Sequence, residues 1–233
     1  MTGIGFGRLF FAYGISELLW NATQGKNDMY KRYIKRLFDL LLSACGLIVL
    51  SPLFLVLILL VIAEDPGSIF FYQKRIGKNR DGRISYFKMY KFRSMKEDAP
   101  RDVPTHLLMN PEQYITRVGR ILRRTSLDEL PQIINILKGD MAIIGPRPAL
   151  WNQEDLYKER EKYGANDVLP GLTGWAQING RDELEIPEKA RLDGEYVEKM
   201  NLFFDMKCFF GSILSVLRCD GFVEGGTGKQ NKQ

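Results

Sequence analysis

The longest apolar segment of the chain runs from Leu40 to Ala63 and contains no Asp, Glu, Lys or Arg in 24 residues. As one continuous helix it would be about 36 Å long, which exceeds the hydrocarbon core of a bilayer, about 30 Å thick. It is too long for a signal peptide, and no small-residue cleavage site follows it. The pattern therefore predicts a helix that enters a membrane.

Ser51-Pro52 lies at the centre of this segment, with 11 uncharged residues on each side. Proline removes a backbone donor and clashes with the preceding turn, so a kink or break is expected there. Two arrangements follow: a kinked helix that spans the membrane, or a broken helix that enters and leaves by the same face. Basic residues flank both ends: Lys31, Arg32, Lys35 and Arg36 before the segment, and Lys74, Arg75, Lys78 and Arg80 after it. Because basic residues gather on the cytoplasmic side, these flanks favour the re-entrant hairpin.

The rest of the chain predicts a mixed α/β domain that is mostly helical. Alternating apolar and polar positions predict short strands at 68–73 and 84–92, joined by a turn-rich loop at 77–82. Helical spacing of apolar positions predicts helices over the ranges 114–138, 151–163, 186–200 and 203–217. The last of these has few charges and several phenylalanines, which is typical of an amphipathic helix lying at a membrane interface.

These patterns divide the chain into four parts. Residues 1–29 form an N-terminal extension with an apolar, aromatic stretch, and residues 30–65 form the membrane hairpin. Residues 66–224 form a cytosolic and interfacial domain, and the polar residues 225–233 form a flexible tail.

The charge of the chain indicates an anionic partner. The net charge is +5 and the isoelectric point is near 9.0, which suits a membrane, a phosphate group or a nucleic acid. No recognisable nucleic-acid-binding motif, P-loop or glycine-rich dinucleotide motif accompanies this charge. Three scattered cysteines and the single His106 argue against a disulfide framework, a zinc site and Ser-His-Asp chemistry. Carboxylates, lysines and arginines remain as the candidates for catalysis.

The adjacent carboxylates of Asp128 and Glu129 are the strongest candidates. One interpretation is structural, since Ser126 and Glu129 have the spacing of a capping box at the start of a helix. The functional interpretation rests on Arg123 and Arg124 just upstream, because carboxylates beside arginines suit a phosphate group with a divalent metal. Aspartate is also a known covalent nucleophile toward phosphoryl groups.

Three further segments could bind phosphate or a nucleotide. Pro146 and Pro148 fix the backbone around Arg147, so its guanidinium fork is either held for a phosphate or lies on a stiff surface turn. Lys91 and Arg93 would share one face of a strand, as a phosphate-binding surface or merely a solvated one. The segment 170–181 (PGLTGWAQINGR) combines three glycines, an aromatic and two amides, which suits either a nucleotide cradle or a buried turn.

Four motifs, in this order, resemble those of a known family: KRLFDLLLSACGLIVLSPLFLVL, YKFRSM, RRTSLDELPQIINILKGDMAIIGPRP and PGLTGWAQINGR. The chain resembles the bacterial sugar transferases, the monotopic polyprenyl-phosphate phosphoglycosyl transferases, from about Tyr30 to Leu217. The length matches the small form of the family, which has only the catalytic domain and the re-entrant helix.

The resemblance implies transfer of a sugar 1-phosphate from a UDP-sugar to undecaprenyl phosphate, with release of UMP. It implies Mg²⁺, a re-entrant helix broken at Ser51-Pro52, and a phospho-aspartate intermediate on the first carboxylate of the pair. Asp128 then corresponds to the nucleophile and Mg²⁺ contact, with Glu129 as its acidic partner. The resemblance also implies substrate or phosphate binding by Arg123, Arg147, Lys91, Arg93, Gln177, Asn179 and Arg181.

The implied location is the bacterial inner membrane, with the catalytic domain on the cytoplasmic face. The implied pathway is the initiation of a cell-surface glycan, and a homo-oligomer is compatible with the sequence. The alternatives are a basic, membrane-tethered module that binds lipid or protein without catalysis, and a metal-dependent membrane phosphatase or nucleotidase. The motifs do not identify the sugar.

Overall fold

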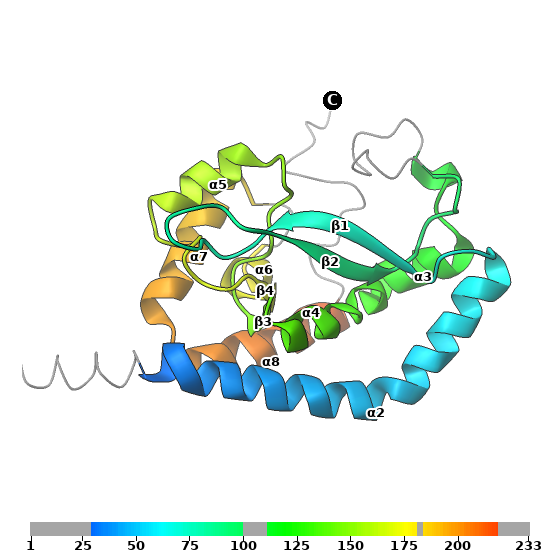
Figure 1. Cartoon of the computed structure of the whole chain (residues 1–233), viewed down its shortest axis with the longest axis horizontal. Coiled ribbons are helices and arrows are strands. Elements are labelled where there is room, and N and C mark those ends of the chain that lie inside the picture. The colour runs from blue at the N-terminus through cyan, green and yellow to red at the C-terminus, as the bar shows by residue number, and fades with distance from the viewer. Residues whose placement is uncertain (1–28, 100–110, 181–183, 219–233) are drawn as a thin grey trace, which may run out of the picture.

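The computed structural model describes residues 29–99, 111–180 and 184–218 of the chain (Figure 1). The predicted N-terminal extension, the flexible tail and Arg181 therefore lie, apart from Met29, outside the described residues. The elements in order are η1 (Tyr30–Ile34), α2 (Lys35–Glu64), β1 (Phe70–Ile76), β2 (Tyr86–Phe92), η3 (Pro111–Gln113), α3 (Arg117–Thr125), η4 (Leu127–Glu129), α4 (Gln132–Lys138), β3 (Ala142–Ile144), α5 (Glu154–Glu161), β4 (Gly171–Thr173), α6 (Trp175–Ile178), α7 (Ile186–Lys199) and α8 (Leu202–Arg218).

The long helix α2 is not broken at Pro52, so the predicted helical break is corrected to a bend. The helix is continuous from Lys35 to Glu64 and bends along its length in Figure 1. Pro52 has no N–H to offer the carbonyl of Ile48, four residues earlier. The Ser51 hydroxyl donates to that carbonyl at 2.7 Å, so the orphaned acceptor is satisfied within the helix. The Ser51 hydroxyl thus takes the place of the missing proline N–H, which explains how the helix continues through Pro52.

Helix α2 is long and apolar enough to cross a membrane, and most of its apolar surface is exposed. The continuous helical segment Tyr30–Glu64 contains a strongly apolar window in which only 17% of the residues are buried, unlike the core helix of a soluble protein. Its two halves contact the domain differently. The N-terminal half buries the polar residues Lys35, Asp39 and Ser43, whereas the C-terminal half buries apolar side chains. The exposed apolar surface is what a membrane-inserted helix requires.

Two small sheets carry the loops around the site. β1 and β2 form the predicted antiparallel hairpin, with Phe70 opposite Phe92 and Ile76 opposite Tyr86. β3 and β4 pair in parallel, with Ala142 opposite Gly171. The Asn135 side chain joins α4 to the hairpin, because it accepts from the N–H of Tyr90 at 3.0 Å and donates to a β2 carbonyl.

The predicted helix over 114–138 is wrong as a single element. Ser126 has a left-handed backbone (φ 57°) that ends α3, and a short 3-10 turn and Pro131 precede α4. A residue in this conformation cannot continue an α-helix. The other three predicted helices correspond to α5, α7 and α8. Helix α8 lies beside α2 in Figure 1, and its apolar side chains are exposed, with Phe203 82% accessible.

Candidate active site

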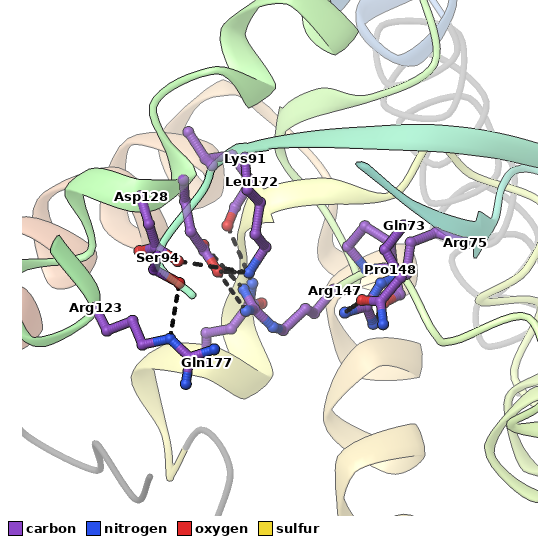
Figure 2. A network of polar contacts seen from close by, with 11 residues as sticks. Gln73, Arg75, Lys91, Ser94, Arg123, Asp128, Arg147, Pro148, Leu172 and Gln177 are labelled. Carbon is purple, nitrogen blue, oxygen red and sulfur yellow. Dashed lines mark hydrogen bonds and ion pairs between the residues drawn. The ribbon is translucent and has the colours of Figure 1, made fainter. Parts of the chain in front are cut away.

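The carboxylates of Asp128 and Glu129 lie on η4, in the connection between α3 and α4 (Figure 2). Ser126 makes no side-chain capping hydrogen bond to this turn, and the Glu129 carboxylate binds basic side chains instead of reaching back. The capping-box interpretation is therefore wrong. The left-handed Ser126 turns the chain so that both acids face β2 and the loop after β3.

Glu129 is held by two cations. Its Oε1 accepts from Lys91 Nζ at 2.8 Å and from Arg147 Nη2 at 2.6 Å, and its Oε2 accepts from Arg147 Nη1 at 3.3 Å. Burial alone would raise the pKa of Glu129, but the charges of Arg147 and Lys91 outweigh it and hold the pKa well below its ordinary value. Glu129 is therefore ionised, and its carboxylate holds both cations beside Asp128.

Asp128 has a different environment from its neighbour. It is buried, and its Oδ2 lies 4.0 Å from Lys91 Nζ, beyond hydrogen-bond distance. Burial raises the pKa of Asp128, Lys91 lowers it and the charge of Glu129 raises it further, with a net rise above the ordinary value. The two carboxylates therefore differ, since Glu129 is bound by two cations and Asp128 is the more basic of the pair.

Arg123 reaches the site from the last turn of α3. Its Nε donates to the Ser94 hydroxyl at 2.9 Å (Figure 2), and its positive charge acts to lower the pKa of Asp128. Ser94 is buried just after β2, in the YKFRSM motif, and sequence analysis missed it. Its position three residues beyond Lys91 was the available signal. Ser94 orients the guanidinium, whose two terminal nitrogens form the planar fork that suits a phosphate.

The loop that carries Arg147 is anchored on both sides. The carbonyl of Pro146 accepts from the Gly171 N–H at 2.9 Å, and the carbonyl of Pro148 accepts from Arg75 Nη1 at 2.9 Å. A Cβ on Gly171 or Gly174 would overlap the backbone of Gly145, so only glycine allows these two segments to pack this closely. The Arg147 side chain is therefore held by Glu129 on an anchored loop, and its binding of a phosphate stays a prediction.

The remaining predicted residues separate into two groups. Gln177 lies at the cluster in Figure 2; its Nε2 is 3.4 Å from the Leu172 carbonyl, and its buried Oε1 has no hydrogen-bond partner among the described residues. Asn179 is exposed, and its amide donates to the Trp175 carbonyl at 2.7 Å. Arg93 does not share a face with Lys91, because β2 ends at Phe92 and the strand alternation ends with it. Arg93 instead forms ion pairs with Asp65 and Glu97, away from the carboxylate pair.

The residues at the site fit a magnesium ion that binds together with a substrate phosphate. Among the described residues, no group of three or more His, Cys, Asp or Glu side chains could hold a metal by itself. Magnesium commonly uses one or two protein carboxylates and takes its other ligands from water and substrate phosphates. Glu129 is engaged by Lys91 and Arg147, which leaves the Asp128 carboxylate as the available protein oxygen ligand.

Comparison with known proteins identifies the family. The family model described as bacterial sugar transferase matches residues 30–219. The chain is 42% identical over 199 residues to the UDP-glucose:undecaprenyl-phosphate glucose-1-phosphate transferase of Escherichia coli, covering 82% of this chain and 41% of that protein. It is 36% identical over 196 residues to the exopolysaccharide production protein ExoY of Rhizobium meliloti, covering 78% and 84% of the two chains.

A third relative carries a different sugar in its name. The undecaprenyl-phosphate galactose phosphotransferase of Salmonella typhimurium is 35% identical over 214 residues, covering 84% of this chain and 44% of that protein. The match to the family model, over residues 30–219, includes the carboxylate pair and the residues that surround it. The chain therefore belongs to the bacterial sugar transferase family and is an enzyme of the sugar-phosphate transferase class.

Proposed function

We propose that this enzyme transfers a sugar 1-phosphate from a UDP-sugar to undecaprenyl phosphate, releases UMP, and so begins the assembly of a cell-surface glycan. The observation that carries this proposal is the buried Asp128 carboxylate beside three basic side chains, Lys91, Arg123 and Arg147. The names of relatives support the lipid acceptor and the sugar-phosphate donor, and they include both glucose and galactose enzymes.

The proposed reaction has two displacements at one phosphorus atom. In the first, Asp128 attacks the phosphorus that bears the sugar, the bond to the bridging oxygen breaks, and UMP leaves with that oxygen. In the second, an oxygen of undecaprenyl phosphate attacks the same phosphorus and releases the Asp128 carboxylate. A covalent intermediate divides one transfer between a soluble donor and a lipid acceptor into two simpler steps.

The neighbouring side chains supply charge and orientation in this scheme. Arg123 and Arg147 stabilise the negative charge on the diphosphate, and Glu129 holds Arg147 and Lys91 in place. Gln177, and Asn179 and Arg181 beyond it, would contact the nucleotide. Magnesium held by Asp128 and the diphosphate would neutralise charge on the departing UMP.

UMP release tests this proposal directly. Detergent-solubilised enzyme is screened against UDP-sugars with and without undecaprenyl phosphate, and one donor is expected to give sustained release only when the lipid is present. EDTA is expected to stop the release, and added Mg²⁺ to restore it. Release that continues without lipid would indicate hydrolysis rather than transfer, and release unaffected by EDTA would remove the metal from the scheme.

The proposal includes a re-entrant arrangement of α2. It is supported by the fact that both ends of α2 contact the same domain: Lys35 pairs with Asp205 of α8 at 2.7 Å, and Asp65, just after α2, pairs with Arg93. A helix that crosses a bilayer would place its two ends on opposite sides. The bend at Ser51-Pro52 allows both ends to return to the cytoplasmic face.

Cysteine labelling distinguishes the hairpin from a spanning helix. In a chain whose native cysteines are replaced, Tyr33→Cys and Lys78→Cys introduce single exposed thiols before and after α2. In spheroplasts, both thiols are expected to resist a membrane-impermeant maleimide and to react after lysis. Labelling of one thiol in intact spheroplasts would show that α2 spans the membrane.

A further inference from the structure

The N-terminal end of α2 contacts the C-terminal end of α4. Arg36 donates from Nη1 to the carbonyl of Ile136 at 2.7 Å and from Nη2 to the carbonyl of Leu137 at 3.2 Å. Both carbonyls belong to the last turn of α4, where helix carbonyls lack their usual i+4 donors, and the Ile136 carbonyl also accepts from the Gly139 N–H at 3.1 Å. A cation at this end is also favoured by the helix dipole. Arg36 therefore caps α4 from outside that helix.

The C-terminal end of α2 makes the opposite contact with α3. The Glu64 carboxylate accepts from the N–H of Arg117 at 2.7 Å and from the N–H of Val118 at 2.8 Å. The next amide, of Gly119, donates to the side chain of Thr116 at 2.8 Å. An anion at a helix N-terminus is favoured by unpaired amides and by the dipole. Glu64 therefore completes the N-terminal cap of α3.

These two caps lie at the outer ends of the segment that carries the carboxylate pair. In chain order, α3 begins at the Glu64 contact, η4 presents Asp128, and α4 ends at the Arg36 contact. Between the caps, α2 packs against the same segment through an apolar cluster. This cluster contains Phe54, Leu57 and Val61 of α2, Phe92 of β2, Leu122 of α3 and Ile133 of α4.

We propose that Arg36 and Glu64 are positioning residues, through which the membrane helix sets the placement of Asp128 relative to Arg123. This inference rests on the proposed function, since it concerns the same site. Helices of nine and seven residues are too short to be stable alone, so their ends depend on outside partners. Arg123 and Asp128 are joined only through the left-handed turn at Ser126, so a shift of either helix changes the separation of these two side chains.

The geometry argues for a role beyond general stability. Each of the two residues uses both of its terminal polar atoms on consecutive backbone groups, which fixes the direction of the capped helix as well as its end. Misplacement of a reacting group by about 1 Å can cost about 100-fold in rate. Losing either cap should therefore act on the attack by Asp128 more than on donor binding.

The test compares Glu64→Ala, Glu64→Gln, Arg36→Met and Arg36→Lys in the full-length enzyme. The readout is the rate at which UMP forms in a single turnover, with its dependence on donor concentration. We expect Glu64→Ala and Arg36→Met to lower the maximal rate about 10- to 100-fold with little change in the half-saturating donor concentration. Glu64→Gln keeps one acceptor oxygen and Arg36→Lys keeps the charge, so each should recover part of the rate.

Matched controls use residues of the same type away from the site. Glu154 lies in the first turn of α5 with its side chain 81% accessible, and Arg191 is an exposed residue of α7. Glu154→Ala and Arg191→Met should leave the rate unchanged. Circular dichroism and thermal unfolding establish the folded fraction of each variant, by which every rate is divided.

The inference is overturned if Glu64→Ala forms UMP at the rate of the unaltered enzyme. It is also overturned if the lower rate of Glu64→Ala is fully accounted for by a smaller folded fraction. A loss that appears only in donor affinity would also overturn it. Failure of the proposed function would look different: the unaltered enzyme would give no lipid-dependent UMP release with any donor, or Asp128→Asn would retain turnover, whatever the Glu64 and Arg36 variants do.

Discussion

Replacing Asp128 by asparagine is expected to lower UMP formation by at least about 10³-fold, the order of loss seen when a covalent nucleophile is removed. The amide has nearly the same shape as the carboxylate but cannot form the acyl phosphate. The change also removes a negative charge that burial and Glu129 both disfavour, as the raised pKa of Asp128 indicates. Stability should therefore be kept or slightly increased, and membrane association should be unchanged.

Asp140→Asn is the matched control for this prediction. Asp140 follows α4, where its carboxylate contacts the side chains of Asn135 and Lys138 rather than those of Lys91 or Arg147. It should retain turnover. When the phosphate that bears the sugar is labelled in the UDP-sugar, the covalent intermediate carries the label. The label should become attached to the unaltered enzyme and to Asp140→Asn, but not to Asp128→Asn. Full turnover by Asp128→Asn would exclude it as the nucleophile.

Asp205→Ala is expected to lower the free energy of unfolding by about 3–5 kcal/mol, because it leaves a buried lysine without its counter-charge. Asp205 accepts from Tyr30 at 2.6 Å, from Lys35 at 2.7 Å and from Tyr196 at 2.8 Å. Burial and the charge of Asp205 raise the pKa of Tyr196 well above its ordinary value, so this phenol remains a donor. Thermal unfolding in detergent measures the loss.

A second variant separates the charge from the packing at this position. Lys35→Met combined with Asp205→Ala removes both charges, so the double variant should be more stable than Asp205→Ala alone. Glu154→Ala, an exposed partner of Lys158, should shift the unfolding midpoint little. An Asp205→Ala midpoint equal to that of the unaltered chain would show that Lys35 is solvated in this chain.

Local sequence predicted the members of the site better than their arrangement. The structure brings together the carboxylate pair, Lys91 and Arg147, because tight turns and strand ends project their side chains at predictable places. The left-handed backbone of Ser126 was not predictable, since it depends on how α3 and α4 pack on α2. For the same reason a periodicity that runs through 114–138 predicted one helix where there are two.

Contacts between distant segments account for the other differences between the predictions from sequence and the structure. Arg93 was expected beside Lys91 by strand alternation, but Asp65 and Glu97 bind it after the strand has ended. Ser94 was missed although it lies in the YKFRSM motif, because its contact with Arg123 joins residues 29 positions apart in the chain. The sequence predicted that Pro52 would disturb the helix, and α2 bends there. It did not predict the hydrogen bond from the Ser51 hydroxyl that keeps the helix continuous.

The ion pair between Lys35 and Asp205 has a consequence for the order in which the protein is made. Its two residues are separated by 170 positions in the chain. At about 5–20 residues per second, Asp205 leaves the ribosome on the order of 10 s after Lys35. Until then Lys35 lacks its ion-pair partner, although Arg36 and Asp39 of the same half of α2 can already bind the carbonyl of Ile136 and the N–H of Ile143. The first turn of α2 therefore reaches its final contacts only when the last helix of the domain has been made.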